Sequence, residues 1–182
     1  DLCLTKDTLI RTSRKDKPIC MLDERSDLIY AVDLVNREVV LTDFSNLRIT
    51  KYVTQLYEIV TNRGSIKCTD NHKILTDRGY IRADELFLVD QIVNADTITK
   101  VCELVRVQQI KQIELNEPIP VYAIEVPKYH NFVLSSGLVV HNSKDVLDTL
   151  AANVYKINQM YAPEIAGSTA VTLAEMNGIT RS

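Results

Sequence analysis

From residue 3 to about residue 140 the chain is a succession of short runs rich in Val, Ile, Thr and Tyr, separated by turn residues. Residues of these types favour pleated, half-buried strands. Between the runs LYEIVT and SIKCT, the tripeptide Asn62-Arg63-Gly64 predicts a hairpin turn in which the glycine supplies a positive φ. The sequence therefore predicts a mainly β domain in which many strands pair with partners distant in the chain.

The pattern changes after residue 142. Apolar residues then recur at three- and four-residue steps, which predicts an amphipathic helix, at Val146, Leu150, Val154, Ile157 and Tyr161. Ser143 stands where a helix N-cap is expected, and Pro163 follows the last apolar position. We therefore expect a domain boundary at Asn142-Ser143, followed by a short helical segment within residues 143–182.

The composition excludes several classes of protein. Hydrophobic residues make up 46% and charged residues 25% of the 182 residues, as expected for a chain with one sizeable apolar core. A net charge of −3 gives no broad basic field for a nucleic acid. The sequence contains neither an apolar run near the roughly 18 residues that span a bilayer nor the apolar centre of a signal peptide at its start. We expect a cytoplasmic protein, and the absence of a CxxC pair among its four cysteines predicts reduced thiols and no metal site.

The chain has only three histidines, and each adjoins residues that are capable of acyl-transfer chemistry. His72 closes the turn Thr69-Asp70-Asn71-His72, His130 lies shortly before the end of the β-rich region, and His141 directly precedes Asn142. Taken singly, each fits an ordinary surface or core histidine. Taken together, they require a shared explanation.

Three motifs in order give the chain a resemblance to the intein family of self-excising protein-splicing elements. CLTKDTLI at residues 3–10 resembles the opening motif, GSIKCTDNHKILT at residues 64–76 the internal Thr-x-x-His motif, and VYAIEVPKYHNFVLSSGLVVHNS at residues 121–143 the closing motif. The resemblance implies a Hint-fold horseshoe with pseudo-twofold symmetry, in which the two ends of residues 3–142 meet centrally. Residues 1–2 and 143–182 would then be host segments, and the reaction would need no cofactor.

At the first junction, the resemblance makes Cys3 the nucleophile that converts the Leu2-Cys3 amide into a thioester. His72 would manage the proton that the departing nitrogen needs, and the Thr69 hydroxyl or a backbone amide would stabilise the oxyanion. The alternatives are that Cys3 is a small buried apolar residue and that Thr69 and His72 only satisfy backbone groups of the turn.

At the second junction, Ser143 would accept the acyl group as a branched ester, more slowly than a cysteine would. Asn142 would then cyclise to a succinimide and cut the Asn142-Ser143 bond, with His141 polarising the carbonyl or protonating the amine and His130 assisting from a neighbouring strand. Rearrangement to an amide would leave Leu2 joined to Ser143. The alternatives are a plain helix N-cap at Ser143 and an ordinary polar residue at Asn142.

One position departs from the family pattern. Inteins usually carry an aspartate, or sometimes a cysteine, at the position of Ala123, where it couples the events at the two junctions. Alanine can neither transfer a proton nor bind a thiol, so coupling is either impaired or handled by another group, with Asp70 as a candidate.

About 35 residues separate Asp84 from Pro118, which leaves no room for the homing endonuclease of larger inteins. We therefore expect a splicing domain alone, monomeric and acting on its own flanking segments. The polar stretch at residues 93–97 is predicted to be a loop where an insertion or a natural break into two complementary chains would lie, and residues 23–26 are a second such place.

The segment SKDVLDTLAANVY after the boundary resembles part of phage terminase large subunits, where Asp145 and Asp148 would share one helix face. Two acidic residues in a first helical turn are an equally good explanation. Two other functions stay open for the whole chain. One is a cleavage-only domain like that of Hedgehog proteins, against which the ending His141-Asn142-Ser143 argues, and the other is a non-processing structural part of a phage DNA-packaging protein.

Overall fold

The computed structural model describes residues 3–142, and within them the chain is built almost entirely of strands. The elements, with η for 3-10 turns, are β1 (Leu4–Thr5), β2 (Leu9–Ile10), β3 (Lys17–Pro18), η1 (Ile19–Met21), β4 (Ile29–Asp33), β5 (Glu38–Thr42), β6 (Ser45–Thr61), β7 (Gly64–Cys68), β8 (Lys73–Thr76), β9 (Gly79–Arg82), η2 (Ala83–Glu85), β10 (Gln91–Asp96), β11 (Val101–Glu125), β12 (Asn131–Val133) and β13 (Val139–His141). The predicted mainly β class is confirmed, whereas the helix expected within residues 143–182 lies outside the described residues.

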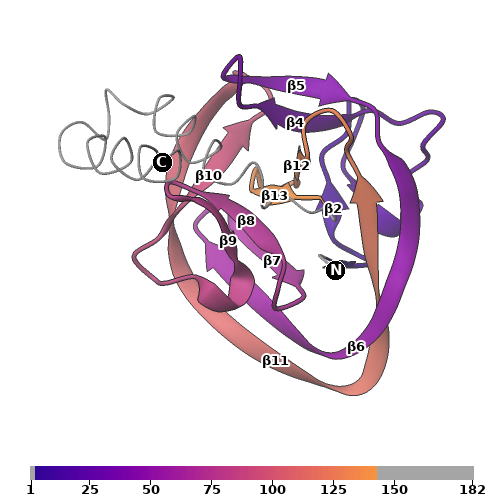
Figure 1. Cartoon of the computed structure of the whole chain (residues 1–182), viewed down its shortest axis with the longest axis vertical. Helices are drawn as coiled ribbons and strands as arrows, with labels where there is room; N and C mark the ends of the chain where they lie inside the picture. Colours follow the sequence, from indigo (N-terminus) through magenta and orange to yellow (C-terminus); the bar gives the residue numbers. More distant parts are fainter. Residues whose placement is uncertain (1–2, 143–182) are drawn as a thin grey trace, which may run out of the picture.

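Two long antiparallel strands, β6 and β11, form the frame of the molecule. They run round the outside in Figure 1, with β8, β12 and β13 inside. The first part of β11 pairs with β10 and its last part pairs with β1, so one strand supports both halves of the main sheet. The sheet follows the order β1-β7-β6-β11-β10-β8-β13-β12, with β9 added to β8. This arrangement is the Hint fold that the sequence predicted.

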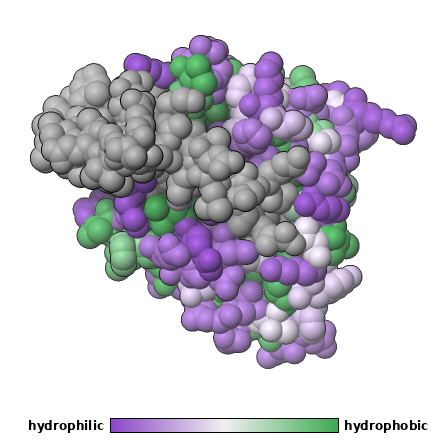
Figure 2. All heavy atoms as spheres, viewed as in Figure 1, coloured by the Kyte–Doolittle hydropathy of each residue, from purple (hydrophilic) through white to green (hydrophobic). Residues whose placement is uncertain are grey.

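Small hairpins and apolar clusters fill and close the frame. The β4–β5 hairpin is held on β12 by the side chain of Asn131, which accepts a hydrogen bond from the Val32 N–H at 2.8 Å and donates one to the Val32 carbonyl at 3.0 Å. The largest cluster contains Phe132, one of the bulkiest fully buried side chains. Hydrophilic residues predominate on the face drawn in Figure 2, with apolar ones scattered among them. Among residues 3–142 no helix is long and apolar enough to cross a membrane.

The predicted turn at Asn62-Arg63-Gly64 is confirmed. Strand β6 ends at Thr61, β7 begins at Gly64, and the φ of Gly64 is 144°. A Cβ at this glycine would lie 2.8 Å from the Cβ of Ser136, so the position also needs the missing side chain.

The loop predicted at residues 93–97 is wrong for most of its length. Residues up to Asp96 belong to strand β10, which pairs with β11, and Val93 and Ala95 are buried in an apolar cluster. Asn94 made the stretch look polar, but its amide nitrogen donates to the Ser136 carbonyl at 2.9 Å, so a strand can bury it. The turn itself covers residues 97–100. The second predicted place, residues 23–26, is an exposed turn.

Candidate functional site

The backbone of Cys3 is clamped by the turn that follows β7. Leu4 pairs with Cys68, and the next residues along the two chains are joined by a hydrogen bond from the Thr69 N–H to the Cys3 carbonyl, at 3.0 Å. The N–H of Cys3 donates to the Thr69 Oγ1 at 3.2 Å. This N–H belongs to the Leu2-Cys3 peptide bond, so Thr69 contacts the nitrogen that would depart during thioester formation.

Asn71 completes this contact and was missed by the sequence reasoning. Its side-chain oxygen lies 2.9 Å from the Thr69 Oγ1 and accepts the hydroxyl proton of Thr69. The oxygen of Thr69 is therefore left to accept the hydrogen bond from Cys3. Asn71 lies within the Thr-x-x-His motif, but the motif alone does not indicate which of its middle residues faces the hydroxyl.

The side chain of Cys3 is completely buried in an apolar cluster with Leu56, Val121 and Ala123. Its Sγ lies 2.7 Å from the Oγ1 of Thr50, a residue of β6 that the sequence reasoning did not single out. Ala123 is only 3% exposed and lies in the same cluster as the thiol, so the position that usually carries the coupling acid is beside Cys3 here. Asp70, the candidate replacement, is exposed.

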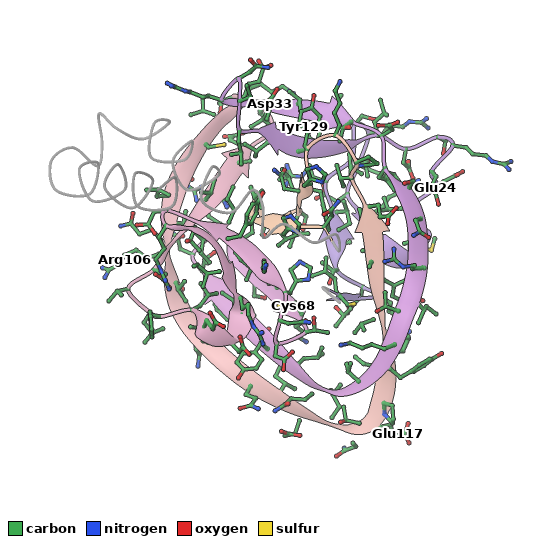
Figure 3. All side chains as sticks on the ribbon, in the orientation of Figure 1. Glu24, Asp33, Cys68, Arg106, Glu117 and Tyr129 are labelled. Carbon is green, nitrogen blue, oxygen red and sulfur yellow. The ribbon has the colours of Figure 1, made fainter. Side chains whose placement is uncertain are left out.

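A second thiol lies close by but is unsuited to compete with Cys3. Cys68 is the last residue of β7 and lies inside the frame formed by β6 and β11, whereas Glu117 lies at the outer bend of that frame (Figure 3). Burial raises the pKa of the Cys68 thiol, with a smaller contribution from Asp70. Cys68 therefore stays protonated, and the thiolate is the form that attacks carbonyl carbons.

His72 lies between the two ends of the described chain and is 1% exposed. Burial, together with the neighbouring His141, lowers the pKa of His72 to about 3, and weak polar contacts of the ring with the backbones of Cys3 and His141 oppose only part of this shift. Neither ring nitrogen has a well-formed hydrogen bond among residues 3–142. The ring is therefore neutral at physiological pH and has a nitrogen available to accept a proton.

Strand pairing explains why His72 reaches the second junction as well. Val140 of β13 pairs with Ile74 of β8 in antiparallel register. Continuing that register by two residues sets Asn142 opposite His72. The four-residue turn 69–72 therefore has Thr69 at the first junction and His72 beside the second.

Asn142 is held by the segment that precedes β12. Its N–H donates to the His130 carbonyl at 3.1 Å, and its side-chain nitrogen donates to the Val126 carbonyl at 3.3 Å. Asn142 is 1% exposed, so its amide is oriented in a pocket that admits almost no water. Val126 is a further residue that the sequence reasoning missed, because it acts only through its backbone.

His141 contacts the carbonyl of the Asn142-Ser143 bond directly. The Nδ1 of His141 is hydrogen bonded to the Asn142 carbonyl oxygen. A carbonyl oxygen can only accept, so Nδ1 carries the proton and polarises that carbonyl. The ring of Tyr80 packs edge-on against His141, with 4.8 Å between centroids and an interplanar angle of 81°, and fixes the orientation of the imidazole.

His130 lies next to this group, as the sequence predicted. It precedes β12, which pairs with β13 through Asn131 and His141, and its φ of 61° is in the left-handed region, which is uncommon for a residue with a side chain. The structure thus brings together Cys3, Thr69 and His72 at one junction, and His130, His141 and Asn142 at the other. Leu2 and Ser143 lie outside the described residues, so their reaction roles stay predictions. Within residues 3–142 no group of three or more metal-ligating side chains is assembled.

Known proteins agree with the fold. No protein-family model matches the chain. It is 38% identical over 88 residues to the B-type subunit of DNA gyrase from Synechocystis sp., a match that covers 47% of this chain and 8% of that protein. The chain thus spans less than a tenth of the length of this curated relative.

Solved structures are similar over most of the chain. A DnaB intein from Synechocystis sp. PCC 6803 is 27% identical with a TM-score of 0.70, covering 79% of this chain and 100% of that one. A DnaX mini-intein from Spirulina platensis is 28% identical with a TM-score of 0.67, covering 77% and 99%. A bacterial intein-like domain from Clostridium thermocellum, at 21% identity and a TM-score of 0.68, covers 77% and 98% and shows the fold alone. The chain therefore has the fold of inteins.

Proposed function

We propose that residues 3–142 form an intein that excises itself and joins Leu2 to Ser143. The observation that carries the proposal is that both predicted scissile bonds are contacted by groups able to act on them. The nitrogen of one bond donates to Thr69, and the carbonyl of the other accepts from His141. His72 lies against the backbone at both places.

In the first step, the Cys3 Sγ bonds to the Leu2 carbonyl carbon and the Leu2-Cys3 C–N bond breaks. The thiol proton leaves the sulfur, and a proton must reach the departing nitrogen. His72 is suited to carry it because its neutral ring can accept a proton and, once protonated in an apolar site, is a strong acid. Thr69 orients the nitrogen through its hydrogen bond.

In the second step, the Ser143 hydroxyl attacks the thioester and releases the Cys3 thiol. In the third, the Asn142 side-chain nitrogen bonds to the Asn142 carbonyl carbon, and the bond to Ser143 breaks as its nitrogen takes up a proton. The His141 Nδ1–H stabilises the charge that develops on that carbonyl oxygen. The Val126 carbonyl holds the attacking amide, and an ester-to-amide shift completes the ligation.

Mass spectrometry of the purified chain tests the proposal. Splicing yields a fragment of residues 3–142 that ends in a succinimide, plus a product in which Leu2 is joined to Ser143. Cleavage at Cys3 alone would favour a Hedgehog-like domain, and an intact chain would favour a non-processing structural role. Cys3→Ala combined with Asn142→Ala is the matched control, and it should leave the chain intact.

Further parts of the assignment belong to the same proposal. Residues 1–2 and 143–182 would be host segments, with the terminase resemblance of residues 143–155 indicating a phage DNA-packaging protein as host. The domain would act in the cytoplasm as a monomer, in one chain or as two complementary fragments. Separate expression of residues 1–96 and 97–182 tests the second form, because the turn at residues 97–100 is a place where the frame can be divided.

A further inference from the structure

The thiol of Cys3 has one polar neighbour within its apolar pocket. Its Sγ lies 2.7 Å from the Thr50 Oγ1, and the Thr50 Oγ1 lies 3.4 Å from the Val121 carbonyl oxygen, to which it donates. A hydroxyl has one proton and two lone pairs, so Thr50 can donate to Val121 and accept the thiol proton of Cys3 simultaneously. The bond to Val121 is long, so little is lost if the hydroxyl turns toward the sulfur.

A β-bulge aims Thr50 at the thiol. On β6, Lys51 pairs with Val121 and Ile49 pairs with Tyr122, so Thr50 has no opposite residue on β11. An extra residue of this kind bends its strand and redirects its side chain, and such bulges occur often beside active sites. The redirected hydroxyl enters the space next to Cys3, which a side chain in regular register on that strand would not reach.

The surroundings make this contact important for reactivity. Cys3 is completely buried, and its neighbours Leu56, Val121 and Ala123 offer no side-chain donor. A thiolate formed there loses its hydration, which is costly unless a hydrogen bond replaces the water. The Thr50 hydroxyl is the replacement that lies within reach.

Resting on the proposed function, we propose that Thr50 is a positioning residue for the first splicing step, orienting the Cys3 thiol and donating to the sulfur as it loses its proton. In that step the S–C bond forms at the Leu2 carbonyl carbon, the C–N bond breaks, and the proton lost by sulfur is matched by one gained at the Cys3 nitrogen. Thr50 gains and loses no proton overall. Its hydroxyl only exchanges the Val121 carbonyl for the sulfur as hydrogen-bond acceptor.

The test measures thioester formation in the full chain, tagged at its N-terminus and carrying Asn142→Ala to prevent asparagine cyclisation. Hydroxylamine cleaves the thioester, and mass spectrometry follows release of the segment that ends at Leu2. Thr50→Val replaces the hydroxyl with a methyl group, Thr50→Ser restores it, and Thr54→Val is the matched control on an exposed position of the same strand. Thr50→Ala repeats the test without a branched side chain, and thermal unfolding establishes that each variant is folded.

We expect Thr50→Val and Thr50→Ala to cleave about 10- to 100-fold more slowly at neutral pH, as the loss of a hydrogen bond to a charged atom predicts. Thr50→Ser and Thr54→Val should stay near the unsubstituted rate. The deficit should shrink at alkaline pH, where the thiol ionises more readily without help, whereas a purely structural defect would persist. Equal rates for folded Thr50→Val and unsubstituted chains overturn the inference alone. An unsubstituted chain that releases nothing overturns the proposed function and this inference with it.

Discussion

Acidification should weaken this fold through His72 in a way that can be measured. The side chain is 1% exposed, and burial, with His141 beside it, lowers its pKa to about 3 in the folded state. In the unfolded chain the pKa returns to about 6.5. The unfolded state therefore binds a proton first, so the folded state keeps its full stability above about pH 6.5 and loses stability as the pH falls toward 3.

These two pKa values set the size of the effect. Lowering the pH from 7 to 5 costs roughly 2 kcal/mol of unfolding free energy through His72 alone. Carboxyl groups also contribute to acid sensitivity. Burial raises the pKa of Asp90, for instance, but its hydrogen bonds to Arg78 and the Phe87 N–H lower it by more. Their contribution must be cancelled by a paired variant.

Urea unfolding at both pH values, with and without His72→Gln, provides that pairing. Cys3→Ala and Asn142→Ala are present throughout, so that the chain stays intact during the measurement. Glutamine does not titrate, so the His72→Gln chain should lose about 2 kcal/mol less between pH 7 and pH 5 than the chain with His72. Losses that agree within about 0.5 kcal/mol would refute the reasoning, because His72 would then bind protons equally in both states.

Three more outcomes follow from particular contacts. Asn131→Ala should lower the unfolding free energy by about 3 kcal/mol in urea titrations, because it leaves two buried backbone groups of Val32 without partners, and a loss under 1 kcal/mol would contradict this. His141→Ala should slow cleavage after Asn142 at least about tenfold while leaving hydroxylamine cleavage at Cys3 unchanged, and equal slowing of both would point to a folding defect. Ala123→Asp should lower the ratio of one-sided cleavage to splicing measured by mass spectrometry, and unchanged kinetics and product ratios would show that Ala123 does not limit coupling.

The sequence predicted the strands well where local chemistry decides them. The glycine of the Asn62-Arg63-Gly64 turn and the alternating runs on either side of it were read correctly, because turn geometry and strand propensity are local properties. The runs at residues 101–115 and 121–126 were read separately but belong to one strand, β11. Its pairing with β6 is interrupted between Glu114 and Ile119, so the break that the sequence indicated is an irregularity inside a continuous strand.

The site was predictable only in part, for a related reason. Cys3, Thr69 and His72 carry reactive groups and form recognisable motifs, and the structure brings them together. Thr50 reaches the thiol only because of a bulge in the pairing of β6 with β11. Pairing register depends on contacts between distant segments, and an ordinary threonine in a β-rich run gives no sign of it.

A single short turn links the chemistry of the two junctions. Residues 69–72 connect β7 to β8, and these strands pair with β1 and β13, the strands nearest the two ends of the described chain. The register of each pairing is fixed by buried side chains such as Leu4 and Val140, because a slip of one residue would turn them out of the core. The same apolar packing that stabilises the sheet therefore sets Thr69 against the Cys3 nitrogen and His72 near Asn142. Coupling between the junctions requires no acid at position 123 to bring the groups together, and Ala123 removes only a proton-transfer group from an arrangement that the strands already hold.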